Sequence, residues 1–206
     1  MIENQVEIEA PKDAKEIATE VTEEQKHHLH KMWKFWYFEN NKERNWEDNL
    51  RVVSPFDTVE DFWSIYNHIK SASEIRNGCS YFVFKDGLKP MWEDEGNRRG
   101  GRWLINFDRK QRQQLDEKWL EVLLCLIGEA FDEDGDDICG AVVDIRGKVD
   151  KISVWTADCR NKERILNIGR KIKERLNLEY QASMTYESHS DTQTKTSSSA
   201  KHIFVL

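Results

Sequence analysis

The segment from Lys89 to Trp103 (KPMWEDEGNRRGGRW) carries side chains that together could bind a flat polar ring. The indole of Trp92 offers a face for stacking, which contributes about 1 to 3 kcal/mol per nucleic-acid base. The Glu93 carboxylate can accept from two neighbouring N–H groups, a pair that guanine offers, and each charge-assisted bond contributes about 1.5 to 3 kcal/mol. A purine carrying positive charge would gain further from cation–π attraction to the indole. The alternative is a charged turn with Trp92 and Trp103 in the core, which composition alone favours.

A second group of candidate binding residues consists of Arg146, Lys148, Lys151 and Trp155. In an extended strand Lys151 and Trp155 point to one face, while the apolar residues between them point to the other. Cations and an indole would then share one surface. Such a surface suits a phosphate chain that ends in an aromatic base. An ordinary solvated hairpin is the alternative.

Catalytic and metal-binding motifs are not evident in the sequence. It contains no P-loop, G-x-G-x-x-G, H-E-x-x-H or G-x-S-x-G motif. The histidines at 27, 28 and 30 are expected on the surface. The acidic run at 132–137 lacks the Glu that a calcium loop needs at its twelfth position, which is Val143 here. These absences argue against an enzyme, and we expect no metal and no cofactor.

Length and composition limit the class of protein. The 206 residues are enough for one domain, or one domain and a tail. Charged residues make up 33% of the chain and mean hydropathy is −0.77, and no apolar run reaches the ~20 residues of a membrane helix. The net charge of −7 argues against general coating of nucleic acid, so any contact with nucleic acid should be local.

The first 26 residues differ from the rest of the chain. They hold eight acidic residues, three lysines and no aromatic residue, and lack the apolar stretch of a signal peptide. We expect a disordered acidic tail over 1–26 and a folded domain over 27–206. The four cysteines form no C-x-x-C pair, which is typical of reduced thiols in the cytosol or nucleus. The expected location is the cytoplasm, with the nucleus as a second location.

Aromatic and β-branched segments predict strands, and three apolar stripes predict helices. The expected strands are 33–38, 81–84, 102–107, 138–145, 151–156, 181–186 and the last five residues. The expected helices follow Thr58, which can cap the first of them, and span about 115–131 and 161–176. Residues 188–201 are polar and predict a mobile loop. Strands grouped between separated helices favour an α+β fold, an antiparallel sheet with helices on one face.

Two of these helices carry more apolar surface than one sheet contact would cover. Val59 and Trp63 add to the stripe of the first helix, and residues 119–127 leave Glu121 as almost the only polar side chain of the second. A helix that is apolar all round is either buried on two sides or binds a partner. The pattern alone leaves both explanations open.

Taken together, these motifs resemble the eukaryotic translation initiation factor 4E family, whose members bind the 7-methylguanosine cap of mRNA. The resemblance covers nearly all of residues 27–206, in order and with matching spacing. The matching segments are WKFWYF at 33–38, FDTVEDFW at 56–63, PMWED at 90–94, GGRW at 100–103, WLE at 119–121, CLIGE at 125–129 and CGAVV at 139–143. It implies a curved antiparallel sheet backed on its convex face by three helices, with the ligand slot on the concave face.

The resemblance also implies roles for individual residues. Trp46 and Trp92 would sandwich the methylated base, Glu93 would accept from its N–H groups, and Trp155 would touch the N7 methyl. The implied phosphate ligands are Arg146 and Lys151, with Lys148, Arg102 and Lys195 as supporting cations. Ser198, which stands between Ser197 and Ser199, matches the family's phosphorylation site.

The implied protein partners bind the helical face. In the family this face binds a helix with the pattern Tyr-x4-Leu-hydrophobic, found in the initiation scaffold protein and in competing repressors. The matching residues are Val59, Trp63, Leu120, Glu121 and Leu124. One departure is His28, which stands where many members have proline. A monomer that binds capped mRNA and starts translation is the first expectation; a regulatory paralogue that recruits repressors or competes for caps is the alternative.

Overall fold

The computed structural model describes residues 26–108, 110–178, 183–194 and 202–206. The acidic tail expected over 1–26 lies outside the described residues, apart from Lys26. The strands are β1 (His28–Phe38), β2 (Leu50–Thr58), β3 (Ser80–Lys85), β4 (Gly101–Phe107), β5 (Ile138–Asp144), β6 (Asp150–Thr156), β7 (Met184–Ser188) and β8 (Phe204–Val205). The helices are α2 (Trp46–Asn49), α3 (Val59–His68), α4 (Arg112–Ile127), α5 (Lys162–Arg175) and α6 (His189–Thr194), with 3-10 turns η1 (Ala72–Glu74) and η2 (Asp132–Asp137).

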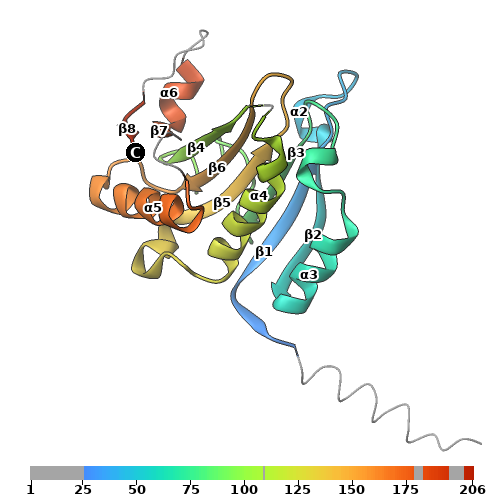
Figure 1. The fold of residues 1–206 in the computed structure, drawn as a ribbon, viewed down its shortest axis with the longest axis horizontal. Coiled ribbons are helices and arrows are strands. Elements are labelled where there is room, and N and C mark those ends of the chain that lie inside the picture. The colour runs from blue at the N-terminus through green and yellow to red at the C-terminus, as the bar shows by residue number, and fades with distance from the viewer. Residues whose placement is uncertain (1–25, 109, 179–182, 195–201) are drawn as a thin grey trace, which may run out of the picture.

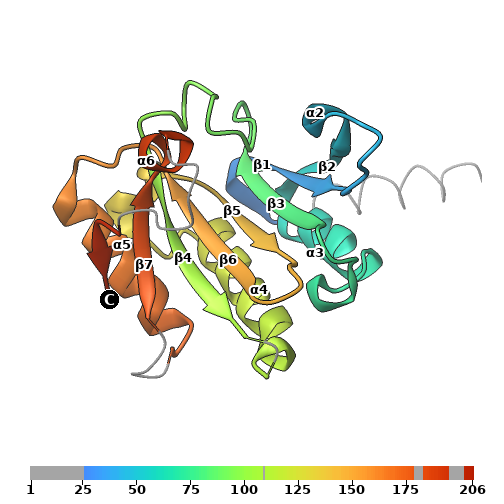
Figure 2. The same cartoon turned by 90° about the horizontal axis from the view of Figure 1, so that it is seen from above.

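All the described strands join one antiparallel sheet in the order β2-β1-β3-β5-β6-β4-β7-β8. The long helices α3, α4 and α5 lie side by side on one face of this sheet (Figure 1). A view from above shows the curvature of the sheet, with these three helices on its convex side and the short helices α2 and α6 towards the other (Figure 2). The predicted α+β architecture is confirmed.

Strand alternation divides the buried side chains between the two faces of the sheet. In β6, Ile152 and Val154 belong to the large core under the helices, while Trp155 belongs to a smaller cluster on the opposite face. Because successive side chains of a strand point to opposite faces, one strand serves both clusters. Trp103 is fully buried in the large core, and its indole N–H donates to the Ile165 carbonyl of α5 at 3.0 Å. The alternative that placed Trp103 in the core was therefore right.

Local signals explain where two helices begin. The Thr58 hydroxyl accepts from the Asp61 backbone N–H at 3.1 Å and caps α3, as predicted. The Asn161 side chain accepts from the Arg164 N–H at 3.2 Å and caps α5. The apolar stripe of α5 then packs on the sheet, with Ile165, Ile168 and Ile172 buried. The burial of each such side chain contributes about 1.5 to 3 kcal/mol.

Several expected elements differ from the structure. Strand β2 was not predicted, because Pro55 interrupts its pattern and four of its nine residues are exposed. It lies at the edge of the sheet, where proline is tolerated. The short helix α2 was also missed. The mobile loop predicted over 188–201 is wrong for its first part: Ser188 ends β7 and residues 189–194 form α6. Packing of His189 against Trp155 offsets the polar composition there. Residues 195–201 lie outside the described part of the chain.

The predicted boundaries shift at other points. Helix α4 begins three residues earlier than expected and ends at Ile127, where Gly128 follows. The strand expected over 181–186 is observed as Met184–Ser188, and residues 181 and 182 are outside the description. No helix among the described residues is long and apolar enough to cross a membrane.

Candidate functional site

A cavity of about 470 Å³ lies on the concave face of the sheet. Three parts of the chain form it: the short helix α2, the loop between β3 and β4, and the strands that make its floor. It brings together six of the predicted site residues: Trp46, Trp92, Glu93, Arg102, Arg146 and Trp155. Its other lining residues are Phe38, Glu47, Ser80, Phe82, Pro90, Met91, Val142 and Asp144.

Helix α2 presents Trp46 at the rim of the cavity. The Asn45 side chain accepts from the Asp48 N–H at 2.8 Å and fixes the start of this single turn. The Trp46 ring packs on Phe38 of β1, with centroids 5.5 Å apart, yet 45% of Trp46 is exposed. A large indole that is supported on one side and open on the other is suited to stacking.

The loop from β3 to β4 carries Trp92 and Glu93. It leaves β3 through a turn in which Gly87 has a φ of +86°, a conformation that favours glycine. Trp92 is half-buried and Glu93 is exposed. The indole N–H of Trp92 donates to the Glu93 carboxylate. The stacking surface and the hydrogen-bond acceptor are thus adjacent at the same wall of the cavity, and the alternative that placed Trp92 in the core with Trp103 is wrong.

The floor of the cavity is formed around Trp155. This ring is 6% exposed and packs edge-on against Phe84 with centroids 5.3 Å apart. The His189 ring of α6 lies behind it at 4.2 Å. Burial, with a contribution from the nearby Arg102 cation, lowers the pKa of His189 to about 3, so this imidazole is neutral at physiological pH. Sequence reasoning missed His189, because a lone histidine in a polar run carries no signal of burial.

Two arginines of the cavity are oriented by carboxylates. Arg102 donates twice to one oxygen of the buried Glu187, at 2.8 and 2.6 Å. Arg146 donates to Asp144 at 2.8 Å, and that same oxygen also accepts from the Ser80 hydroxyl at 2.6 Å. Such charge-assisted bonds fix the planes of the guanidinium groups. About two-fifths of the Arg146 side chain remains exposed. Both cations are therefore held in place beside the aromatic floor.

Two other predicted cations, Lys151 and Lys148, are not among the lining residues of the cavity. Lys151 is half-buried on β6, opposite Asn106 and Asp144, and Lys148 is exposed in the turn that precedes β6. Lys195 and Ser198 lie outside the described residues. The polar lining residues Glu47, Ser80 and Asp144 were missed because nothing in their spacing distinguishes them from surface residues.

Known proteins resemble this chain over most of its length. The family model described as eukaryotic initiation factor 4E matches residues 28–204.

The chain belongs to the eukaryotic initiation factor 4E family.

Human eukaryotic translation initiation factor 4E is 54% identical over 182 residues, which are 88% of this chain and 84% of the human protein. The 4E-1A protein of Danio rerio is 55% identical over 182 residues, with coverages of 88% and 85%. Ascaris suum eIF4E-3, solved with an m2,2,7G cap, has a TM-score of 0.83 at 46% identity, covering 88% of this chain and 99% of the other. A schistosome eIF4E, solved with m7GpppG and 4E-BP, has a TM-score of 0.83 at 38% identity, with coverages of 88% and 100%.

The helical face of this 4E-family chain carries the residues predicted for a partner. Val59, Trp63, Leu120, Glu121 and Leu124 are all half-buried. The Trp63 ring packs edge-on against Phe62 and Tyr66, at 5.1 and 5.9 Å between centroids. Trp63, Leu120 and Leu124 pack on the large core with one side. Trp63, Leu120 and Leu124 are thus supported by the core on one side, and all five residues keep part of their surface exposed.

His27 contacts the start of α3 at the border of this face, next to His28, which stands where many family members have proline. The backbone N–H of His27 donates to Glu60 at 2.9 Å, and its ring Nδ1 lies 2.7 Å from the other Glu60 oxygen. These bonds lower the pKa of Glu60 to about 2. The Val59 N–H donates to the His27 carbonyl at 2.9 Å. The entering chain is therefore attached to the start of α3 without the stiffness of a proline.

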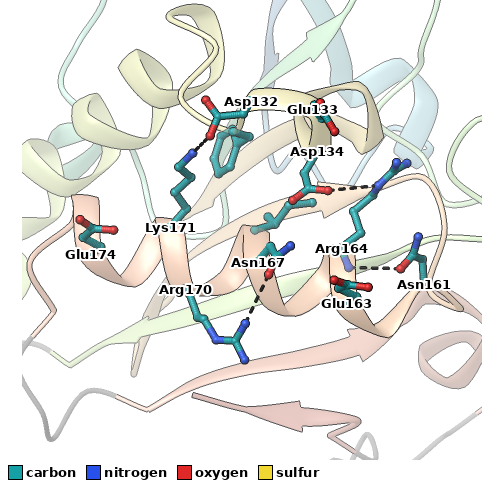
Figure 3. A pocket seen from close by; sticks show the side chains of 12 residues that line it. Asp132, Glu133, Asp134, Asn161, Glu163, Arg164, Asn167, Arg170, Lys171 and Glu174 are labelled. Carbon is teal, nitrogen blue, oxygen red and sulfur yellow. Dashed lines mark hydrogen bonds and ion pairs between the residues drawn. The ribbon is translucent and has the colours of Figure 1, made fainter.

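A second cavity, of about 660 Å³, lies between η2 and α5 on the helical side of the sheet (Figure 3). Four of its charged side chains form two ion pairs: Lys171 contacts Asp132, and Arg164 lies 3.3 Å from Asp134. Arg170 donates to Asn167 at 3.3 Å. Phe131 is its one aromatic residue among the described lining residues. The described lining of this second cavity contains no indole, whereas the concave cavity has Trp46 and Trp92. We therefore take the concave cavity as the candidate binding site.

Proposed function

We propose that this chain binds the 7-methylguanosine cap of mRNA in the concave cavity and recruits an initiation scaffold protein through its helical face. The observation that carries the proposal is the meeting of Trp46, Trp92 and Glu93 in one open cavity. Members of the same family have been solved with m7G and m2,2,7G caps. The reaction class is binding alone, with no bond broken.

The proposed chemistry of base recognition follows from the side chains. Methylation at N7 makes guanine cationic, so an indole face attracts it more strongly than unmodified guanine. Trp46 and Trp92 would stack on its two faces, Glu93 would accept from N1–H and the exocyclic amine, and Trp155 would contact the methyl group. Stacking and hydrogen bonding of ~5 to 10 kcal/mol, less the cost of association, correspond to micromolar affinity or tighter.

The phosphates of the cap would be bound by the cations at the same face. Arg146 and Arg102 line the cavity and are held by carboxylates, so they are the inner candidates. Lys151 and Lys148 follow Arg146 along the chain and would act further out, with Lys195 as an additional cation. Because these contacts are electrostatic, the affinity for 7-methyl-GTP should fall as salt concentration rises.

The proposed partner of the helical face is an amphipathic helix with the pattern Tyr-x4-Leu-hydrophobic. The uncovered outer surfaces of Val59, Trp63, Leu120 and Leu124 support this assignment. Related proteins have been solved with the 4E-binding protein Mextli and with 4E-BP. A scaffold protein and repressors would compete for this one face. We propose a cytoplasmic role, with Ser198 as a candidate phosphorylation site.

The test is a titration of tryptophan fluorescence with 7-methyl-GTP and, in parallel, with GTP. Stacking on Trp46 and Trp92 should quench the emission with the methylated ligand at micromolar concentration or below, and far less with GTP. Adding 7-methylguanosine without phosphates separates base recognition from phosphate binding, because only the phosphorylated ligand should lose affinity with salt. Equal quenching by 7-methyl-GTP and GTP, or none with either, would show that the cavity does not select caps.

A further inference from the structure

The two indoles at the rim of the cavity stand on irregular backbone, in the loops 39–49 and 86–100. The first loop contains only the single turn α2, and the second contains no helix or strand. Stacking needs both rings at a fixed separation, and a loop without a ladder of backbone bonds does not provide this by itself. Each loop contains one buried asparagine, Asn49 in the first and Asn97 in the second.

Asn97 connects the two ends of the turn that carries Trp92. Its side-chain N–H2 group donates to the Lys89 carbonyl at 2.7 Å and to the Met91 carbonyl at 2.8 Å. Met91 directly precedes Trp92, so one of these bonds fixes the peptide unit next to the indole. Asn97 has no exposed surface and does not line the cavity. Its contribution to binding would therefore come through the backbone and not through contact with a ligand.

Asn49 forms a similar link in the loop of Trp46. Its side-chain N–H2 group donates to the Asn41 carbonyl at 2.8 Å, across the turn that precedes α2. Asn49 is 4% exposed and, like Asn97, does not line the cavity. Its backbone carbonyl accepts from the Glu39 N–H at 2.9 Å, which closes the loop at its base.

The orientation of both amides follows from their partners. Backbone carbonyls only accept, so the nitrogen of each amide must face them. The side-chain oxygen of each asparagine is buried without a hydrogen-bond partner among the described residues. Burying an amide with an unpaired oxygen is unfavourable, and an apolar side chain of similar volume would avoid this cost. These two positions therefore require a side chain that can donate hydrogen bonds.

We propose that Asn97 and Asn49 are positioning residues that hold Trp92 and Trp46 at the separation needed to enclose a base. This inference rests on the proposed binding of 7-methylguanosine caps. The Asn97 side chain donates two hydrogen bonds close to Trp92, whereas the Asn49 side chain donates one hydrogen bond further from Trp46. Loss of Asn97 should therefore weaken ligand binding more than loss of Asn49. A second anchor supports the Asn97 loop: the Asp94 carboxylate accepts from the Lys89 and Gly96 N–H groups at 3.2 and 3.0 Å.

The substitution Asn97→Asp tests the donor role, because it keeps the size and removes both N–H donors. A carboxylate would face two carbonyl oxygens and repel them, and Asp94 adds a further negative charge in the same loop. The expected result at pH 8 is a 10- to 100-fold weaker affinity for 7-methyl-GTP, with binding of a Tyr-x4-Leu-hydrophobic peptide at the helical face within twofold of wild type. Between pH 8 and pH 6 the ratio of variant to wild-type Kd should shrink, because the protonated carboxyl can donate to one carbonyl again.

Three further variants complete the test of the two asparagines. Asn49→Asp should weaken 7-methyl-GTP binding three- to tenfold. Tyr81→Phe is the matched control: its hydroxyl also donates to a backbone carbonyl, that of Lys70 at 3.0 Å, but outside the cavity, so cap affinity should not change. If Asn97→Asp does not fold, Asn97→Ala removes the donors without adding charge and should weaken binding at least fivefold. Cap affinity within twofold of wild type for a folded Asn97 variant would overturn the inference; absence of binding by the wild type would instead refute the proposed function.

Discussion

Glu93 provides the sharpest test of base recognition, through the substitution Glu93→Gln. Two charge-assisted hydrogen bonds to guanine contribute ~1.5 to 3 kcal/mol each. Glutamine keeps one acceptor oxygen but places an N–H group opposite the second N–H of the base and removes the charge that favours a cationic ring. We expect a loss of about 3 to 4 kcal/mol, which is roughly 100- to 1,000-fold in the Kd for 7-methyl-GTP. Because Glu93 is exposed in the open cavity, the free energy of unfolding should change by less than ~0.5 kcal/mol.

The assay is fluorescence titration with 7-methyl-GTP, accompanied by thermal unfolding of each variant. The amide oxygen of glutamine can still accept from the Trp92 indole N–H, so this contact between neighbouring side chains is kept. Glu95→Gln is the matched control, since this neighbouring exposed carboxylate faces Arg98 at 3.5 Å and lies outside the cavity lining. Its Kd should stay within twofold of wild type. A Glu93→Gln variant that binds within threefold of wild type would refute the assigned role of Glu93.

Three further predictions concern the helical face, the phosphates and the floor of the cavity. Trp63→Ala should weaken binding of a Tyr-x4-Leu-hydrophobic peptide at least tenfold in calorimetry without changing cap affinity; a parallel loss of cap binding would indicate general unfolding instead. Arg146→Gln should weaken the affinity for 7-methyl-GTP about tenfold and make that affinity less dependent on salt, but the affinity for 7-methylguanosine should stay within twofold of wild type. An equal loss of affinity for both ligands would contradict a phosphate contact. Burial lowers the pKa of His189 to about 3 in the folded protein, so below pH 6.5 this side chain takes up a proton only on unfolding. The free energy of unfolding is therefore highest above pH 6.5, and it should fall by about 1 to 3 kcal/mol as the pH is lowered to 4.5. Urea unfolding at several pH values measures this pH dependence of the free energy of unfolding. The substitution His189→Phe should make it weaker, whereas His202→Gln, at an exposed position, should not change it. An unchanged pH dependence in His189→Phe would show that other groups cause it.

Much of the fold was predictable because its signals are local. The caps of α3 and α5 and their apolar stripes lie within a few residues, and helical periodicity follows directly from the backbone. The alternation in β6 correctly separated Ile152 and Val154 from Trp155. The proximity of Trp92 and Glu93 is given by their adjacency in the chain. Trp46, in contrast, entered through the family resemblance, since an isolated tryptophan in a polar stretch carries no local signal.

Other features depend on contacts that no local period encodes. Strand β2 has an irregular pattern and exists because it pairs with β1, and α6 forms where His189 is covered by Trp155. The sequence could not tell that Trp103 is a core residue while Trp92 faces the cavity, although both stand in the same tract. It also did not distinguish Arg102 and Arg146, which carboxylates hold at the cavity, from Lys148 and Lys151, which lie away from its lining.

The sequence by itself therefore determined the kinds of side chain available, the helices with strong caps and stripes, and the pairing of an indole with a carboxylate. The tertiary structure decided which side chains meet. Trp46, Trp92 and Trp155 are far apart in the chain and reach one cavity because the order and curvature of the strands bring their segments to the same face. The physical reason is that periodicity records only neighbours within a few residues, whereas strand order is set by burial over the whole sheet.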